Sequence, residues 1–233
     1  MLVDPDTFSR NLKALRDRMA RCCEACNRDP ESVELLPVTK THPPEAIRYV
    51  VEAGLTAIGE NRVQEAVAKK ADGTGPDLRW ELIGHLQTNK ARQALDTFDR
   101  IQSVDSLKLA RRLDRLAGQA DRRLPVLIQV NTGEDPRKYG FTIDAFRDAW
   151  TDLTALEHLQ IDGLMTIAPL DDDPAVAGKA FCTLRDLRSW ARDAGPLPLD
   201  VLSMGMTGDL EAAIAAGSTQ IRVGTALFGE RPA

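Results

Sequence analysis

Eight short apolar segments recur along the chain, and a helical pattern separates most neighbouring pairs. Strands that alternate with helices in this way form parallel sheets, and eight of them favour a (β/α)8 TIM barrel. An open, doubly wound sheet is the alternative. The 233 residues are 43% hydrophobic and contain no linker-like segment, so we predict one domain over residues 1–233. The expected strands are residues 33–39, 56–59, 79–83, 100–103, 125–131, 160–164, 199–203 and 219–223.

Helix signals lie between these strands. Apolar residues at helical spacing begin after Glu45, after Asp105 and after Thr207, and a glycine follows each run at Gly54, Gly118 and Gly217. We interpret Asp105 as the N-cap of its helix.

An extra amphipathic helix is predicted before the first strand. Cys23 and Cys26 form a C-x-x-C pair, a spacing also found in redox and metal sites. No second Cys/His pair completes a zinc site, and the cysteines continue the apolar stripe of the helix, so we interpret them as small buried hydrophobes. The stripe comprises Phe8, Leu12, Leu15, Met19, Cys22, Cys23 and Cys26.

Composition narrows the possible partners. Lys and Arg total 30 against 35 acidic residues, and this formal charge of −5 argues against a nucleic-acid partner. No apolar run reaches the roughly 18 residues of a membrane span, and the amino-terminal segment has no apolar centre of a signal peptide. We therefore expect a cytoplasmic protein without a membrane partner.

Lys40 is the first candidate for a residue with a chemical function. It ends the apolar run that starts at Val33, and a turn then leads into a helix. Barrel enzymes place their functional groups at such strand ends, and a lysine amine is a nucleophile toward an aldehyde. The alternative is a surface lysine that closes a strand.

Two glycine-rich turns follow the seventh and eighth predicted strands. Loops at these places in a barrel often hold a phosphate through backbone N–H groups, and serine and threonine hydroxyls can add donors. Ordinary helix capping is the alternative for each turn. The turns comprise Ser203, Met204, Gly205, Met206, Thr207 and Gly208, and then Arg222, Val223, Gly224 and Thr225.

An amine and a phosphate cradle on one face suit a ligand that carries both an aldehyde and a phosphate. Pyridoxal 5′-phosphate (PLP), held as a Schiff base on Lys40, is the leading candidate, and a phosphorylated sugar aldehyde in a Schiff-base aldolase is the competitor. Arg222 precedes Gly224 by two residues and so points to the same side. Because arginine keeps its proton, it would donate to an unprotonated pyridine nitrogen and weaken the cofactor as an electron sink. A salt-bridged arginine at the barrel mouth is the alternative.

Several sequence blocks resemble the pyridoxal phosphate homeostasis protein family, and IGHLQTNK at 83–90 and SMGMTGD at 203–209 are the most specific. The resemblance extends in order from the first strand to the carboxyl terminus. The remaining blocks are VTK at 38–40, IGEN at 58–61, GLM at 163–165 and RVGTALFG at 222–229.

The resemblance implies a single barrel like the N-terminal domain of alanine racemase, with PLP on Lys40. It places Asn61 near the cofactor, Arg222 at the pyridine nitrogen, and His85 and Lys90 on the same face. A helix N-cap for Asn61 and a structural histidine for His85 are the alternatives. The family pattern usually has serine at position 207, where threonine keeps the hydroxyl. The implied phosphate positions are Ser203, Thr207, Gly224 and Thr225.

The chain is expected to carry PLP rather than to catalyse. Racemisation needs acid/base groups on both faces of the substrate, and similar racemases take the second group, a tyrosine, from another domain of a partner subunit. We expect no such domain here. Of the two tyrosines, Tyr49 lies in a predicted helix and Tyr139 follows the fifth strand, where we favour a packing role. The expectation is a monomer that buffers PLP or delivers it to PLP-dependent apo-enzymes; a single-domain amino-acid racemase is the alternative.

Overall fold

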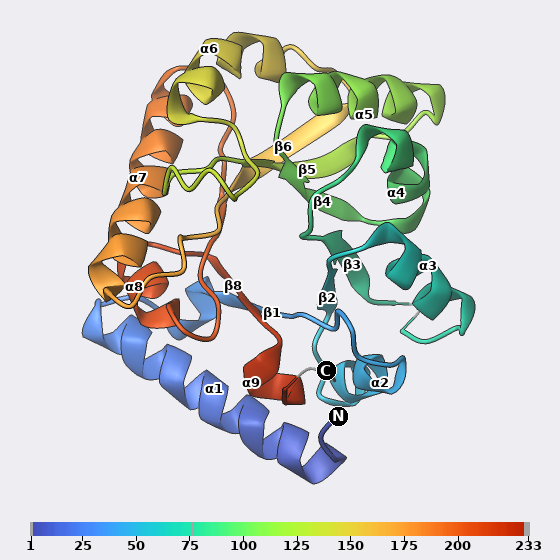
Figure 1. Cartoon of the computed structure of the whole chain (residues 1–233), viewed down its shortest axis with the longest axis vertical. Helices are drawn as coiled ribbons and strands as arrows, with labels where there is room; N and C mark the ends of the chain where they lie inside the picture. The colour runs from blue at the N-terminus through green and yellow to red at the C-terminus, as the bar shows by residue number, and fades with distance from the viewer. Residues whose placement is uncertain (1, 76, 231–233) are drawn as a thin grey trace.

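Eight parallel strands form one sheet that curls into a barrel, with helices around the outside (Figure 1). The computed structural model describes residues 2–75 and 77–230. The strands are hydrogen-bonded in the order β1-β8-β7-β6-β5-β4-β3-β2, which confirms the predicted barrel. Their bounds are β1 Glu34–Pro37, β2 Ala57–Glu60, β3 Arg79–Leu82, β4 Arg100–Val104, β5 Leu124–Gln129, β6 Leu159–Met165, β7 Val201–Ser203 and β8 Gln220–Val223.

The barrel closes between β1 and β2, directly beside the predicted functional lysine. Val38 forms a parallel bridge with Gly59, and the N–H of Thr39 donates to the Gly59 carbonyl over 3.1 Å. On its other side, the N–H of Val38 donates to the carbonyl of Val223 in β8 over 2.8 Å. The backbone just before Lys40 is therefore held by both neighbouring strands.

Helices follow the strands and cover the barrel (Figure 1). No helix in the described part of the chain is long and apolar enough to cross a bilayer. The helices are α1 Pro5–Ala25, α2 Glu45–Glu52, α3 Val63–Ala71, α4 Ala91–Thr97, α5 Leu107–Gln119, α6 Ile143–Thr154, α7 Pro174–Asp193, α8 Leu210–Ala215 and α9 Thr225–Phe228, with the 3-10 turns η1 Pro30–Ser32 and η2 Thr88–Lys90.

The helix α1 precedes the barrel and packs along α8 and α9 (Figure 1). Asp4 caps it by accepting a hydrogen bond from the N–H of Thr7, and Pro5 occupies the first turn. Its Phe8 ring stacks on Phe228, with ring centroids 5.3 Å apart. Phe8, Leu12, Leu15, Met19 and Cys23 are buried, which confirms that part of the predicted stripe, whereas Cys22 and Cys26 are only half-buried.

Several predicted boundaries are wrong by a few residues. The strand β1 ends at Pro37, so Lys40 lies in the following turn rather than in the strand. The strand β7 begins at Val201 because Leu199 has a φ of 48°, outside the strand region. The N-cap of α5 is Ser106, whose side chain accepts from the N–H of Leu109, and Asp105 has a different role.

Candidate functional site

A cavity of about 710 Å³ opens where the strands end. This volume lies within the range of small-molecule sites. The lining comes from segments after β1, β2, β3, β5, β6, β7 and β8, which only the closed barrel brings together. Seven of the residues predicted to bind the cofactor share this lining: Lys40, Asn61, His85, Thr207, Arg222, Gly224 and Thr225.

Lys40 is positioned by a buried ion pair behind it. The Lys69 ammonium of α3 donates to Oε1 of Glu60 over 2.5 Å and to the carbonyl of Thr39 over 2.7 Å. The Thr39 hydroxyl donates to the same carboxylate oxygen over 2.5 Å. Burial raises the pKa of Glu60, and the Lys69 ammonium opposes that shift. This cluster fixes the peptide immediately before Lys40, and Thr41, with a φ of 64°, then turns the chain toward α2.

Arg222 lies at the base of the cavity with its guanidinium held from two sides. Nη1 donates to Oγ of Ser203 in β7 over 2.8 Å, and Nη2 donates to the carbonyl of Thr166, just after β6, over 2.8 Å. Burial lowers the pKa of Arg222 to about 10, while the carboxylates of Asp209 and Glu81 oppose the shift. The group is therefore a fixed cation and hydrogen-bond donor at neutral pH.

A hydrogen-bond chain through the barrel interior orients Ser203. The amide Nε2 of Gln102 donates to Oε2 of Glu81 (2.6 Å) and to Oε1 of Gln220 (2.7 Å). Oε1 of Gln102 then accepts from the Ser203 hydroxyl over 2.7 Å. Because the hydroxyl hydrogen is used there, the serine oxygen presents lone pairs to Arg222. The barrel interior thus stabilises the arginine through four linked residues.

Ser203, Met204 and Gly205 are fully or nearly fully buried beneath the cavity. Met204 belongs to the hydrophobic core. Gly205 has a φ of 96°, and a Cβ there would lie 2.5 Å from Cβ of Ala213, so this position requires glycine. In this arrangement Ser203 positions Arg222. The phosphate role predicted for Ser203 stays a prediction.

The two predicted turns reach the cavity through their later residues. After β7 these are Met206, Thr207 and Gly208, and after β8 they are Gly224 and Thr225. The β7 turn is anchored, because the N–H of Met206 donates to Oδ1 of Asp209 over 2.6 Å and Arg18 of α1 donates to the Thr207 carbonyl over 2.9 Å. Hydroxyl groups and backbone from both turns therefore face one space.

His85 is part of a cluster that the sequence did not reveal. Its Nδ1 lies 2.7 Å from Oδ2 of Asp105, and its ring stacks on Tyr139 with centroids 3.7 Å apart at 9°. Tyr139 also lines the cavity and is 57% exposed, so it packs on His85 at the site itself rather than only within its loop. Asp105 resembled a helix cap, and residues 85, 105 and 139 follow three different strands, so spacing alone gave no signal of their contact.

The structure also places Asn61 and Lys90, the two remaining residues that the sequence assigned to the site. Asn61 lines the cavity, and the N-cap of α3 is Arg62, so the interpretation of Asn61 as a helix cap is wrong. Lys90 lies in η2 and is not among the residues that line the cavity.

Comparison with known proteins identifies the family. The family model described as "Alanine racemase, N-terminal domain" matches residues 3–232. A pyridoxal phosphate homeostasis protein of Pseudomonas aeruginosa is 39% identical over 225 residues, which is 97% of this chain and 96% of the relative. This chain belongs to the pyridoxal phosphate homeostasis protein family. The Escherichia coli member is 37% identical over 231 residues, and the match covers 96% of this chain and 97% of the Escherichia coli protein.

Solved structures agree with this assignment. PipY of Synechococcus elongatus, a family member solved with PLP bound, is 43% identical to this chain and superposes with a TM-score of 0.85. The match covers 95% of this chain and 100% of the PipY chain. Alanine racemase of Clostridium difficile has a TM-score of 0.78 at 14% identity, over 98% of this chain and 58% of its own. The racemase likeness shows the fold alone, whereas PipY shows that a close structural relative holds PLP.

Proposed function

We propose that this protein binds PLP in the cavity as a Schiff base on Lys40 and serves in PLP homeostasis. The observation that carries the proposal is the shared cavity, which is lined both by Lys40 after β1 and by the turns that follow β7 and β8. The amine nitrogen of Lys40 replaces the aldehyde oxygen, which leaves as water.

The cavity residues fit the separate parts of the cofactor. Thr207 and Thr225 offer hydroxyls, and Gly208 and Gly224 let backbone approach a phosphate closely. The buried Arg222 guanidinium suits the pyridine nitrogen, and Asn61 lies on the β2 side. When bound, PLP supplies an electron sink for amino-acid chemistry.

Arg222 favours a carrier over a catalyst. PLP is a stronger electron sink when its ring nitrogen is protonated, a state that a carboxylate partner would stabilise. Arg222 is protonated at neutral pH and can only donate, so it stabilises an unprotonated nitrogen instead. A site of this kind holds a reactive aldehyde reversibly, for buffering or for delivery to PLP-dependent apo-enzymes. We also propose that the protein is a monomer and that it resides in the cytoplasm.

Tyr139 supports a second candidate, a single-domain amino-acid racemase. Such an enzyme needs two acid/base groups, and Tyr139 lines the same cavity as Lys40 but comes from the segment after β5. Polarimetry with L-alanine and PLP-loaded protein separates the candidates. Loss of optical rotation at an enzymatic rate, abolished by Tyr139→Phe, would establish the racemase and end the carrier proposal.

Attachment to Lys40 is tested by absorbance and mass mapping. PLP-loaded protein is expected to be yellow, and borohydride should bleach it and fix the cofactor on the peptide that contains Lys40. Lys40→Ala should abolish the imine absorbance, whereas the control Lys90→Ala should keep it because Lys90 lies outside the cavity lining. An unchanged spectrum in Lys40→Ala, or label on another lysine, would overturn the assignment.

A further inference from the structure

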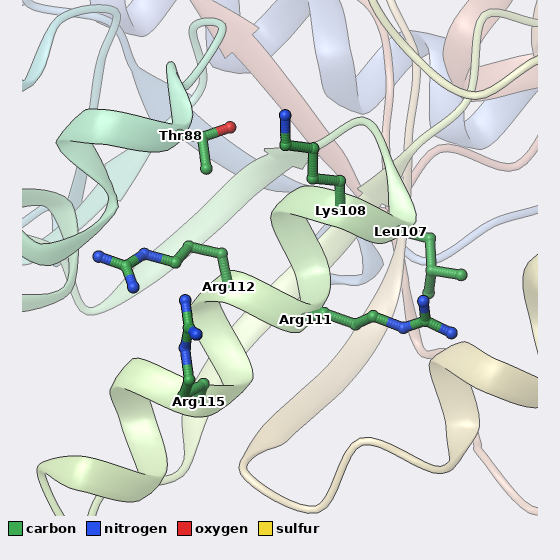
Figure 2. Close-up of a pocket in the computed structure, with 6 residues that line it drawn as sticks. All are labelled: Thr88, Leu107, Lys108, Arg111, Arg112 and Arg115. Carbon is green, nitrogen blue, oxygen red and sulfur yellow. The ribbon is translucent and has the colours of Figure 1, made fainter.

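A second concave site of about 430 Å³ lies between η2 and the first three turns of α5, and we call it the α5 groove (Figure 2). It is lined by Thr88, Leu107, Lys108, Arg111, Arg112 and Arg115. Four of these six residues are cations and none is a carboxylate, in a chain whose formal charge is −5. The groove is therefore a local concentration of positive charge on an acidic protein.

The cations of the groove differ in their pairing. Arg111 points away from the others in Figure 2 and forms an ion pair with Asp152 of α6 over 2.8 Å. Arg112 and Arg115 extend from the opposite side of α5, toward the segment that carries Thr88 (Figure 2). Within residues 2–75 and 77–230, Lys108, Arg112 and Arg115 have no carboxylate within ion-pair distance. These three charges repel one another and lack a counter-charge from the protein.

The α5 groove shares the chain segment after β3 with the PLP cavity. Thr88 lies three residues after His85, and Lys108 lies three residues after Asp105. His85 lines the cavity and is bonded to Asp105 over 2.7 Å. The His85–Asp105 contact therefore joins the two segments that line the α5 groove, and one of these segments also lines the cavity.

We propose that the α5 groove binds a small phosphorylated anion that carries two or more phosphate groups. The planar guanidinium forks of Arg112 and Arg115 match phosphate oxygens in pairs, Lys108 adds a point charge and Thr88 adds a hydroxyl. Residues 108 and 115 are separated by about 10 Å along the helix axis, which is farther than one phosphate reaches. The groove volume of about 430 Å³ suits a small molecule.

The test uses inorganic pyrophosphate as the probe and PLP-loaded protein, so that the cofactor occupies the other anion site. Isothermal titration at roughly 0.15 M salt, where exposed charges are screened beyond about 8 Å, should detect binding to the parent protein. Arg112→Gln/Arg115→Gln should weaken binding at least tenfold. The matched control Lys13→Gln/Arg185→Gln removes two positive charges that lie outside the groove and are already paired with Asp17 and Asp186, and it should change binding less than twofold.

Backbone amide NMR provides a second measurement that is independent of the variants. Pyrophosphate should shift the signals of Thr88 and Lys108 in the PLP-loaded parent protein. The proposal is overturned if the parent does not bind pyrophosphate, if both double variants weaken it equally, or if the shifts map to the cavity turns. Binding of an acidic peptide to the groove without binding of pyrophosphate would also overturn it and would assign the groove to a protein partner.

Discussion

Arg222 donates a hydrogen bond from Nη1 to the hydroxyl oxygen of Ser203 over 2.8 Å, and Ser203 passes its own hydrogen to Gln102. The arginine is thus oriented from within the barrel, on the side away from the cavity opening. The hydrogen bond between Arg222 and Ser203 gives a direct test of how the protein positions the Arg222 guanidinium.

Ser203→Ala removes the central oxygen of this chain. Nη1 of Arg222 and Oε1 of Gln102 would each lose a buried partner, which costs about 1–3 kcal/mol per unsatisfied group. We expect PLP affinity to fall about tenfold and the imine absorbance band to shift. The control Ser189→Ala lies in α7, where its hydroxyl donates to the carbonyl of Arg185 on the exposed surface. Unchanged affinity and spectrum in Ser203→Ala would show that Thr166 alone positions the arginine.

Tyr139 should slow the exchange of PLP by closing over the cavity against His85. Tyr139→Ala removes a stacked pair worth about 0.5–1.5 kcal/mol, so PLP transfer to an excess of apo-enzyme should become roughly two to ten times faster. Tyr139→Phe keeps the ring and should change the rate less than twofold. Equal rates in all three proteins would contradict this role for the stack.

The Glu60–Lys69 pair should stabilise the fold only while both partners are present. Lys69→Met leaves the Glu60 carboxylate buried without its cation, and such a loss costs about 3–5 kcal/mol. Glu60→Leu combined with Lys69→Met should recover most of that loss, as measured by urea unfolding at neutral pH. The exposed pair Lys13–Asp17 is the control, and Lys13→Met should cost less than about 0.5 kcal/mol. Additive losses in the buried double variant would contradict the pairing.

Gly205→Ala should destabilise the turn beneath the cavity. The residue has a φ of 96°, and the new methyl group would lie 2.5 Å from Cβ of Ala213 and 2.8 Å from Cδ1 of Ile221. Left-handed strain and overpacking each cost about 1–3 kcal/mol, which should lower the thermal midpoint measurably. Gly208→Ala is the control, because a Cβ there meets nothing within 4 Å. Equal midpoints for both variants would show that the turn can relax.

The sequence by itself determined the alternation of eight strands with helices. From that alternation it also followed that Lys40, Thr207 and Thr225 line the same cavity. These conclusions rest on local periodicity and on the fact that the ends of parallel strands share one face. Local patterns are less exact at element ends, which is why the prediction extended the first strand to residue 39, beyond its end at Pro37, and gave the α5 cap to Asp105.

The tertiary structure alone decided which side chains touch across the barrel. Gln102 and Ser203 are 101 residues apart, and His85 meets Tyr139 from a different strand end. Such contacts depend on barrel closure and strand register, which no short sequence window contains. For the same reason the sequence gave no sign that Ser203 donates to Gln102 and accepts from Arg222 in the closed barrel, and its phosphate role stays a prediction.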